Sequence, residues 1–296
     1  MIVSVLTNKS GFFSQFFFLL NHYLFAKENN MSFQIDSTHW IFKYDKGFED
    51  YFIPISIGRS KNDIHKMNDN SIQKYKHGDN LKKYTFIQYT EAIYDVYRVN
   101  KSIITKTEEM KQKFHLQNYH YASIFIRRGD KLLEESKFIP THIYVEYLLS
   151  KDKNCHTIFL QTDDYRSYLE MVDYIRLKKY NIQVFTMSNP KDQGMIIFSI
   201  FKSAIYNTKQ KDDYFRQNII QNTKPIDKYT RDEIKEHVEN MLVGIEIVST
   251  SNICVTDYQS NVSRFIKLYH INPNVVYDVR DIHVDYMKFI RPECGF

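Results

Sequence analysis

The chain has 296 residues, of which 43% are hydrophobic and 16% aromatic, whereas only 8 are glycine and 6 are proline. This composition excludes disordered and fibrous proteins and leaves one large or two modest globular domains. The net charge of +5 arises from interspersed basic and acidic residues, so it gives no indication of nucleic-acid binding.

The first 36 residues predict a strand, a helix and a second strand. "IVSVLT" alternates like a strand, the apolar run from Gly11 to about Asn29 is helical, and "SFQID" is strand-like. The apolar run is shorter than the roughly 20 residues of a membrane span and contains polar residues, so we expect a buried helix and no transmembrane segment. With three widely spaced cysteines and no evident secretion signal, a cytoplasmic location is expected.

The middle of the chain predicts a break between two halves. A lysine- and asparagine-rich stretch from about Arg59 to Lys83 indicates an exposed insertion or loop. Helical spacing over residues 90–114 then predicts a linking helix. We therefore expect one α/β domain at residues 1–118 and a second at residues 119–296.

Strands and helices alternate from Tyr121 onward. The expected strands are "ASIFIR", "HTIFLQT", "IQVFTM" and "NICVT", and the expected helices include "DDYRSYLEMVDYI", "GMIIFSIFKSAIY" and "NVSRFIKLYH". Such alternation predicts an α/β fold with a parallel, doubly wound sheet, in which functional residues lie at the carboxyl ends of the strands.

Three polar clusters each follow a predicted strand in the second half. They are Arg127, Arg128, Asp130, Lys131 and Glu135; Thr162, Asp163 and Asp164; and Asp257, Tyr258, Gln259, Ser260, Asn261, Ser263 and Arg264. If these strands are neighbours in one sheet, the clusters converge on one crevice. The crevice would offer guanidinium groups to a polyanion and carboxylates for proton transfer.

The arginine pair is the strongest indication of a ligand. A guanidinium presents a planar fork of donors that matches phosphate oxygens, which makes a diphosphate the natural partner of Arg127 and Arg128. The alternative is a pair of surface arginines in ion pairs. The triplet Arg128-Gly129-Asp130 also matches an adhesion motif, but that function needs an exposed tip, whereas "SIFIR" predicts a buried strand.

Asp163 and Asp164 allow two interpretations. Adjacent carboxylates bind divalent metals, but two acidic residues that open a helix also cap it and complement its dipole, and we favour the capping role. The 11 histidines show no metal-ligand spacing. Ser260 and Ser263 stand where a helix is expected to begin, a position that suits an anion. No phosphate-binding loop or dinucleotide fingerprint occurs.

Three stretches in order resemble a known family. "IFIRRGDK", "IFLQTDD" and "SNICVTDYQSNVSRFIKLY" are similar to the motifs of the α1,2/α1,6-fucosyltransferase superfamily, most of all to its α1,6 branch. The opening "GFFSQFFFLLNHYLFAKENNMSFQID" is similar to the first turn and helix of the acceptor half of these enzymes. The resemblance spans most of the chain.

The resemblance implies two Rossmann-like domains in a GT-B-type architecture. The C-terminal domain would bind GDP-fucose and the N-terminal domain a glycan acceptor, in an inverting reaction that needs no metal and no other cofactor. It further implies that Glu135 is the general base, with Glu134 as the alternative, that Lys131 and Asp163 position it, and that Arg128, and with it Arg127, stabilises the leaving diphosphate.

Three features depart from the family pattern, and one is the glycine-rich first turn, which is reduced here to "KSGFF". Phe125 replaces the histidine of the first motif, so a nucleotide contact is missing or is supplied by another residue. Gln259 stands where a phosphate-binding serine is expected. A different GDP- or UDP-sugar donor is therefore one alternative, and a non-enzymatic carbohydrate-binding or adhesion protein is another.

Overall fold

The computed structural model describes residues 1–7, 10–55, 65–67, 84–117, 120–128, 138–190, 195–196 and 224–281. The chain divides into two compact units, one of residues 1–106 with 226–243 and one of residues 107–225 with 244–296. Two of the three boundaries fall inside helices, α4 (Lys101–Lys113) and α10 (Arg231–Ser249), and the third lies between residues 225 and 226. The sequence prediction divided the chain after residue 118, and its assignment of acceptor and donor halves stays a prediction.

The N-terminal unit contains a three-stranded parallel sheet in the order β2-β1-β3. Strand β1 (Ile2–Val5), helix α1 (Phe12–Glu28) and strand β2 (Phe33–Asp36) form the predicted strand–helix–strand opening. Strand β3 (His65–Met67) pairs with residues 2–4 of β1. The prediction of a loop is wrong for these three residues, because backbone pairing to β1 makes them a strand without an apolar pattern. The rest of 59–83 lies outside the described residues.

Helix α1 is buried along most of its length, as the sequence predicts. The ring of Phe12 lies 5.2 Å from the rings of Trp40 and Phe42, measured between centroids, in an aromatic core that includes Tyr51 and Phe52. This packing explains the high aromatic content of the first 52 residues. None of the helices in the described parts of the chain has both the length and the apolarity to cross a membrane.

The predicted linking helix is two helices. Helix α3 (Phe86–Val96) begins at a capping box of Thr85 and Gln88, and α4 follows after a break at residues 97–100. In the break Val99 forms a bridge with Phe52, and the Asn100 side chain accepts a hydrogen bond from the backbone N–H of Ile103 at 3.1 Å. A helix-capping asparagine inside the apolar periodicity is the physical reason for the interruption.

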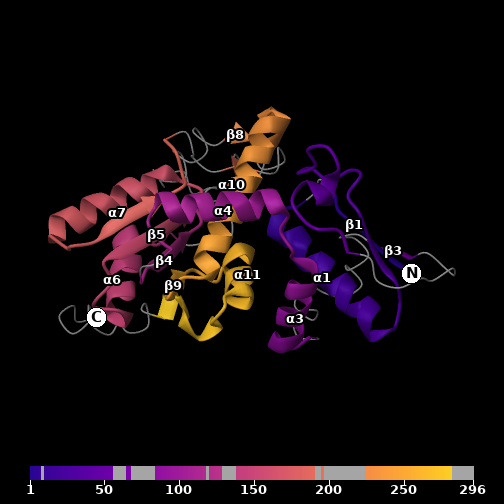
Figure 1. Ribbon diagram of the computed structural model, residues 1–296, viewed down its shortest axis with the longest axis horizontal. Helices are drawn as coiled ribbons and strands as arrows, with labels where there is room; N and C mark the ends of the chain where they lie inside the picture. The colour runs from indigo at the N-terminus through magenta and orange to yellow at the C-terminus, as the bar shows by residue number, and fades with distance from the viewer. Residues whose placement is uncertain are drawn as a thin grey trace, which may run out of the picture. The chain divides into compact units, whose positions relative to one another are not determined.

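The C-terminal unit is built on a five-stranded, wholly parallel sheet in the order β10-β9-β4-β5-β6 (Figure 1). The strands are β4 (Ala122–Ile126), β5 (Thr157–Thr162), β6 (Gln183–Thr186), β9 (Ile253–Thr256) and β10 (Val276–Asp278). The sequence analysis did not predict β10. The parallel sheet it predicted is confirmed.

Helices pack on both faces of this sheet. The face that carries Ile124 and Leu160 joins a core with α6 (Thr141–Lys151) and α7 (Tyr165–Lys178). On the other face, Phe159 and Phe185 contact Phe114, just after α4, with ring centroids 6.1 and 5.3 Å apart. The C-terminal part of α10 covers this same face, and α11 (Asn261–Tyr269) follows β9. The doubly wound arrangement leaves the strand ends as the place for polar side chains.

The remaining short elements include one correction. Met195–Ile196 form strand β7, which pairs in parallel with β8 (Lys224–Pro225), although the sequence predicts a helix from residue 194 to 206. A short apolar run is compatible with a strand as well as with a helix, so its pattern could not distinguish the two. Residues 197–206 lie outside the described residues. Short 3-10 helices occupy Gly47–Asp50, Ile226–Lys228 and Pro273–Val275.

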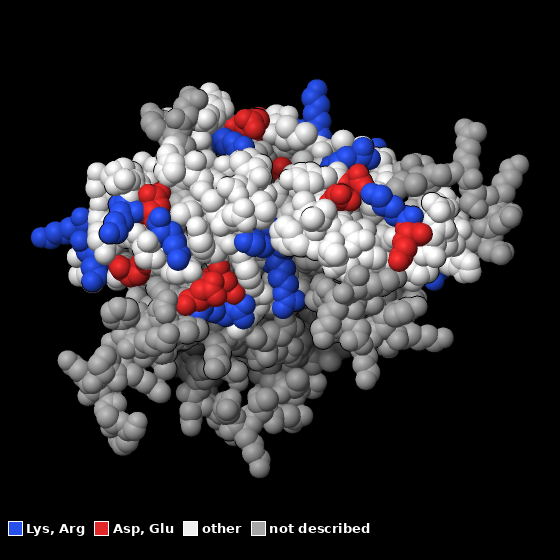
Figure 2. Space-filling view, turned by 90° about the horizontal axis from the view of Figure 1, so that it is seen from below, with Lys and Arg blue, Asp and Glu red and all other residues white. Residues whose placement is uncertain are grey.

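Charged side chains on the face shown in Figure 2 are mixed. Lys and Arg side chains lie near Asp and Glu side chains and are separated by uncharged surface. Proteins that bind nucleic acid gather basic residues on one face or stripe. Among the described residues, this face carries no such cluster or stripe of basic side chains.

Candidate functional site

The polar clusters meet at the carboxyl edge of the C-terminal sheet. Strand β4 lies between β5 and β9, with Ile126 in register with Thr162 and Phe125 in register with Thr256. Residues that follow these strands therefore leave the sheet at one edge, so the condition for convergence, that the three strands are neighbours in one sheet, is met. Asp130, Lys131, Glu134 and Glu135 lie outside the described residues.

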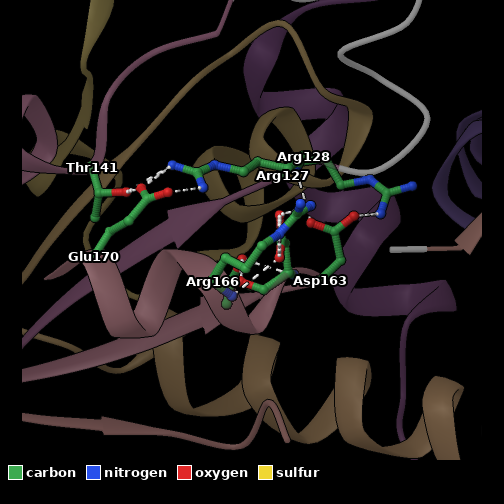
Figure 3. Close-up of polar contacts among 8 residues, drawn as sticks. Arg127, Arg128, Thr141, Asp163, Arg166 and Glu170 are labelled. Carbon is green, nitrogen blue, oxygen red and sulfur yellow. Dashed lines mark hydrogen bonds and ion pairs between the residues drawn. The ribbon is translucent and has the colours of Figure 1, made fainter. Parts of the chain in front are cut away.

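Arg128 is clamped beneath this edge. Its Nη1 and Nη2 donate to Glu170 Oε1 and Oε2 at 2.9 and 2.6 Å, and Nη2 also donates to Thr141 Oγ1 at 2.8 Å (Figure 3). The Phe138 ring stacks on the guanidinium at 4.7 Å. Only 3% of the side chain is exposed. The fork that could grip an anion is therefore occupied by Glu170, a residue that the sequence analysis did not single out.

The carboxylate of Glu170 completes this clamp. It accepts a further hydrogen bond of 2.6 Å from the Thr141 hydroxyl. Burial raises the pKa of Glu170, but the hydrogen bonds and charge of Arg128, together with the Thr141 hydroxyl, outweigh that effect and lower the pKa overall. Glu170 is therefore held as an anion whose charge compensates the buried guanidinium.

Arg127 points the opposite way. Figure 3 shows the two guanidinium groups on opposite sides of the backbone, with Arg127 directed to Asp163. Asp163 forms an ion pair with Arg127 Nη1 through Oδ2, and its Oδ1 accepts the backbone N–H of Arg128 at 2.8 Å. The side chain of Arg127 is 18% exposed, six times the exposure of Arg128. Asp163 thus orients Arg127 at the rim of the edge.

Asp164 and Thr162 are structural in this arrangement. Asp164 caps α7, accepting from the backbone N–H of Arg166, and both its oxygens bind the Arg166 guanidinium. The Thr162 hydroxyl accepts from the Asp164 backbone N–H at 3.1 Å. The predicted capping role is confirmed for Asp164, whose side chain is almost fully buried. Contact of either residue with a donor molecule stays a prediction.

The turn between β9 and α11 is held by hydroxyl groups. Ser260 caps α11 by accepting from the Ser263 backbone N–H at 3.0 Å, which confirms that the helix begins there. The Ser263 hydroxyl is bonded to both Thr256 and Ser260, at 2.7 and 2.8 Å. The hydroxyls are thus engaged with each other, and what this helix start presents outward is its backbone.

The other members of this turn are tied to the protein as well. The Tyr258 hydroxyl donates to the Val276 carbonyl at 2.7 Å. The Arg264 Nε donates to the Tyr258 carbonyl at 3.0 Å, and its Nη1 lies 3.5 Å from Asn261 Oδ1. These bonds fix the loop that follows β9.

Asp257 belongs to an ion-pair group with two residues that the sequence analysis missed. Arg280 Nε lies 3.2 Å from Asp257 Oδ1, and Arg280 also pairs with Asp278 through both carboxylate oxygens. Burial raises the pKa of Asp257, opposed by the Gln259 backbone N–H and by Arg280. The sequence signal was available, since "VVYDVRD" is an apolar run followed by charged residues, the same pattern as the other clusters.

Three buried polar atoms at this edge lack a hydrogen-bond partner within the described parts of the chain. They are Gln161 Oε1 on β5, Gln259 Oε1 after β9 and Arg128 Nε after β4. Buried polar atoms in native proteins are nearly always paired, so such atoms call for a specific explanation. The three residues lie at or just after the ends of three adjacent strands, which makes this edge the candidate place for a polar ligand.

Comparison with known proteins shows which solved structures share the fold of this chain. No family model and no curated protein sequence matches the chain. Among solved structures, NodZ α-1,6-fucosyltransferase soaked with GDP-fucose has a TM-score of 0.55 at 10% identity, over 90% of this chain and 92% of that one. The structure of fucosyltransferase NodZ from Bradyrhizobium has a TM-score of 0.50 at 10% identity, over 90% and 92%.

A third structure extends this similarity. POFUT1 in complex with GDP has a TM-score of 0.53 at 10% identity, over 94% of this chain and 98% of that one. The chain therefore has the fold of these proteins, and the predicted α/β fold class of GT-B type is confirmed.

The adhesion interpretation of Arg128-Gly129-Asp130 conflicts with the structure. A receptor would have to reach the Arg128 guanidinium, which is buried and bound to Glu170 and Thr141. The burial of Arg128 therefore argues against an adhesion role for the triplet.

The clamp can be tested through Glu170→Gln. The amide cannot compensate the buried guanidinium, so we expect a loss of about 2 kcal/mol in the free energy of unfolding at pH 7. Because the pKa of Glu170 is lowered on folding, the carboxylate stabilises at neutral pH and loses this effect as the pH falls through the folded-state pKa. Urea denaturation across this range should show the two proteins converging in acid. The exposed Glu109→Gln is the control, and an equal loss there would contradict the clamp.

Proposed function

We propose that the protein is a glycosyltransferase that transfers fucose from GDP-fucose to a hydroxyl of a glycan acceptor. The observation that carries the proposal is the arginine pair at the carboxyl edge of the C-terminal sheet, one clamped and one at the rim. Its support is the fold shared with NodZ, whose structure was soaked with GDP-fucose, and with POFUT1, whose structure contains GDP. Other GDP- or UDP-sugars are the alternative donors.

We assign direct contact with the diphosphate to Arg127. It is the more exposed of the two arginines, and Asp163 holds it without burying it. Arg128 would act through the backbone, because its own N–H fixes Asp163 and its side chain anchors the strand end. This reverses the order that the family resemblance implied, in which Arg128 is the first of the two arginines to stabilise the diphosphate.

The start of α11 would assist at the same edge. Backbone N–H groups at a helix N-terminus and the helix dipole favour an anion. The Ser260 and Ser263 hydroxyls support this indirectly, by fixing the turn through their mutual hydrogen bonds. Gln259, in the turn before α11, and Asn261, the first residue of α11, are the side chains we place toward the donor.

The reaction follows from these groups. The acceptor oxygen forms a bond to the anomeric carbon from the face opposite the leaving group, while the bond from that carbon to the β-phosphate oxygen breaks and GDP departs. The transition state resembles an oxocarbenium ion, with negative charge growing on the diphosphate. We propose that Arg127 stabilises this charge without a metal, as a preorganised electrostatic partner.

The acceptor proton needs a base. We propose Glu135, with Glu134 as the alternative, because both lie among the nine residues between Arg128 and Phe138, whose ring stacks on Arg128. Lys131, in the same stretch, would position the base and adjust its pKa, and Asp130 would support the loop. Asp163 would contribute by positioning Arg127. A glycan acceptor held by the N-terminal unit and a cytoplasmic location complete the proposal.

The donor is tested by calorimetry with a panel of nucleotides. We expect GDP and GDP-fucose to bind, and UDP and UDP-sugars to bind at least tenfold more weakly. Addition of EDTA should leave the affinities unchanged. Undetectable GDP binding would overturn the proposal, and preferential binding of a UDP-sugar would change the donor.

The roles of the two arginines are separable with lysine. Arg127→Lys keeps the charge but loses the fork, so turnover should fall about 10- to 100-fold with an unchanged melting temperature. Arg128→Lys cannot reach both oxygens of Glu170 and Thr141 at once, so it should lower the free energy of unfolding by about 2 kcal/mol. Wild-type turnover in Arg127→Lys would contradict the assignment.

The base is tested by a matched pair of variants. Glu135→Gln should retain GDP-fucose binding and lose transfer by at least about 100-fold, since an amide cannot accept the acceptor proton. Glu134→Gln is the control and should transfer normally. The reverse pattern would move the role to Glu134, and two active variants would remove both from the mechanism. Product analysis at saturating acceptor measures this.

A further inference from the structure

Gln161 is a buried polar side chain with no evident structural task. It is the penultimate residue of β5, a strand in which Thr157 is half-buried and the other residues are buried, and only 8% of it is exposed. Its Oε1 has no hydrogen-bond partner in the described parts of the chain. A methionine would fill the same space without an unpaired acceptor, so the amide lowers stability unless something binds to it.

The fold makes room for this amide. Gly244 of α10 lies directly against it, and a Cβ atom at residue 244 would overlap the Gln161 amide oxygen, carbon and nitrogen. Glycine inside a helix is itself unfavourable compared with alanine. Gln161 on β5 and Gly244 on α10 are thus both residue types that lower the stability of the fold at the point where they meet.

Within its row of three side chains, Gln161 carries the polar atom that lacks a hydrogen-bond partner in the described residues. Phe125 on β4 is in register with Gln161 on one side and with Thr256 on the other, so the three side chains lie side by side on one face of the sheet. Phe125 has no polar side-chain atom, and the Thr256 hydroxyl is bonded to Ser263 at 2.7 Å. The row lies roughly 7 Å along the strand from Asp163, the partner of Arg127.

We propose that Gln161 is a specificity-determining residue of the donor site, where its amide oxygen accepts a hydrogen bond from a hydroxyl or N–H of the donor nucleoside. An acceptor of this kind suits a nucleoside and repels a phosphate oxygen, which leaves the diphosphate to Arg127. The inference rests on the proposed function and adds a contact that no motif in the sequence indicated.

The experiment measures GDP and GDP-fucose affinity by calorimetry, with thermal unfolding in parallel. Gln161→Met should weaken both ligands equally, about 5- to 20-fold, the effect of one hydrogen bond to a buried group, with a melting temperature no lower than wild type. Gly244→Ala, which keeps the glutamine but displaces its amide, should weaken them in the same direction. The double variant should lose no more than Gln161→Met, because both changes remove the same contact.

Ser32→Ala is the matched control, since it removes another buried oxygen without a partner, at a site in the N-terminal unit. It should leave the GDP affinity unchanged. Wild-type GDP affinity in Gln161→Met would overturn the inference and leave the proposed function standing. A loss confined to GDP-fucose would overturn the assignment to the nucleoside. If the wild-type protein binds no GDP, the proposed function fails first and this inference fails with it.

Discussion

The candidate site depends on the pairing of one buried guanidinium. A charge as well shielded as that of Arg128 is tolerated in a protein only when it is paired and hydrogen-bonded. Glu170 and Thr141 meet that requirement from two helices, α7 and α6, and Phe138 covers the remaining face. The clamp thereby ties the end of β4 to both helices that pack on the same face of the sheet.

The rest of the edge follows from this anchor. With Arg128 fixed, its backbone N–H holds one oxygen of Asp163, and the other oxygen turns Arg127 to the rim. On the far side of β4, hydroxyl groups fix the start of α11. A ligand at this edge would therefore meet groups already in place, which is what electrostatic stabilisation of a developing charge requires.

The sequence predicted the parallel sheet and the positions where its polar residues emerge better than the roles of those residues. Strand ends followed by polar clusters identified Arg127, Asp163 and Ser260, because the period of two and the parallel alternation fix where such residues emerge. The partner of Arg128 could not be predicted. Glu170 lies one and a half turns into α7 and looks like a solvated helix charge, and only the packing of α7 brings it to the guanidinium.

Elsewhere the failures have equally local reasons. Asn100 divides an apolar pattern that looks continuous, since a capping side chain is invisible to periodicity. His65–Met67 become a strand through pairing with β1 alone. Gln161 looks like an ordinary strand residue in the sequence. Its significance comes from an Oε1 without a hydrogen-bond partner in the described parts of the chain and from the contact with Gly244, neither of which a sequence shows.

The most direct measurement is a crystal structure of the protein soaked with GDP-fucose. The account predicts diphosphate oxygens within about 3 Å of the Arg127 guanidinium, with Arg128 still bound to Glu170 and Thr141. A diphosphate bound by Arg128 with Glu170 displaced would contradict the division of roles. A nucleotide bound away from the carboxyl edge of the C-terminal sheet would contradict the site itself.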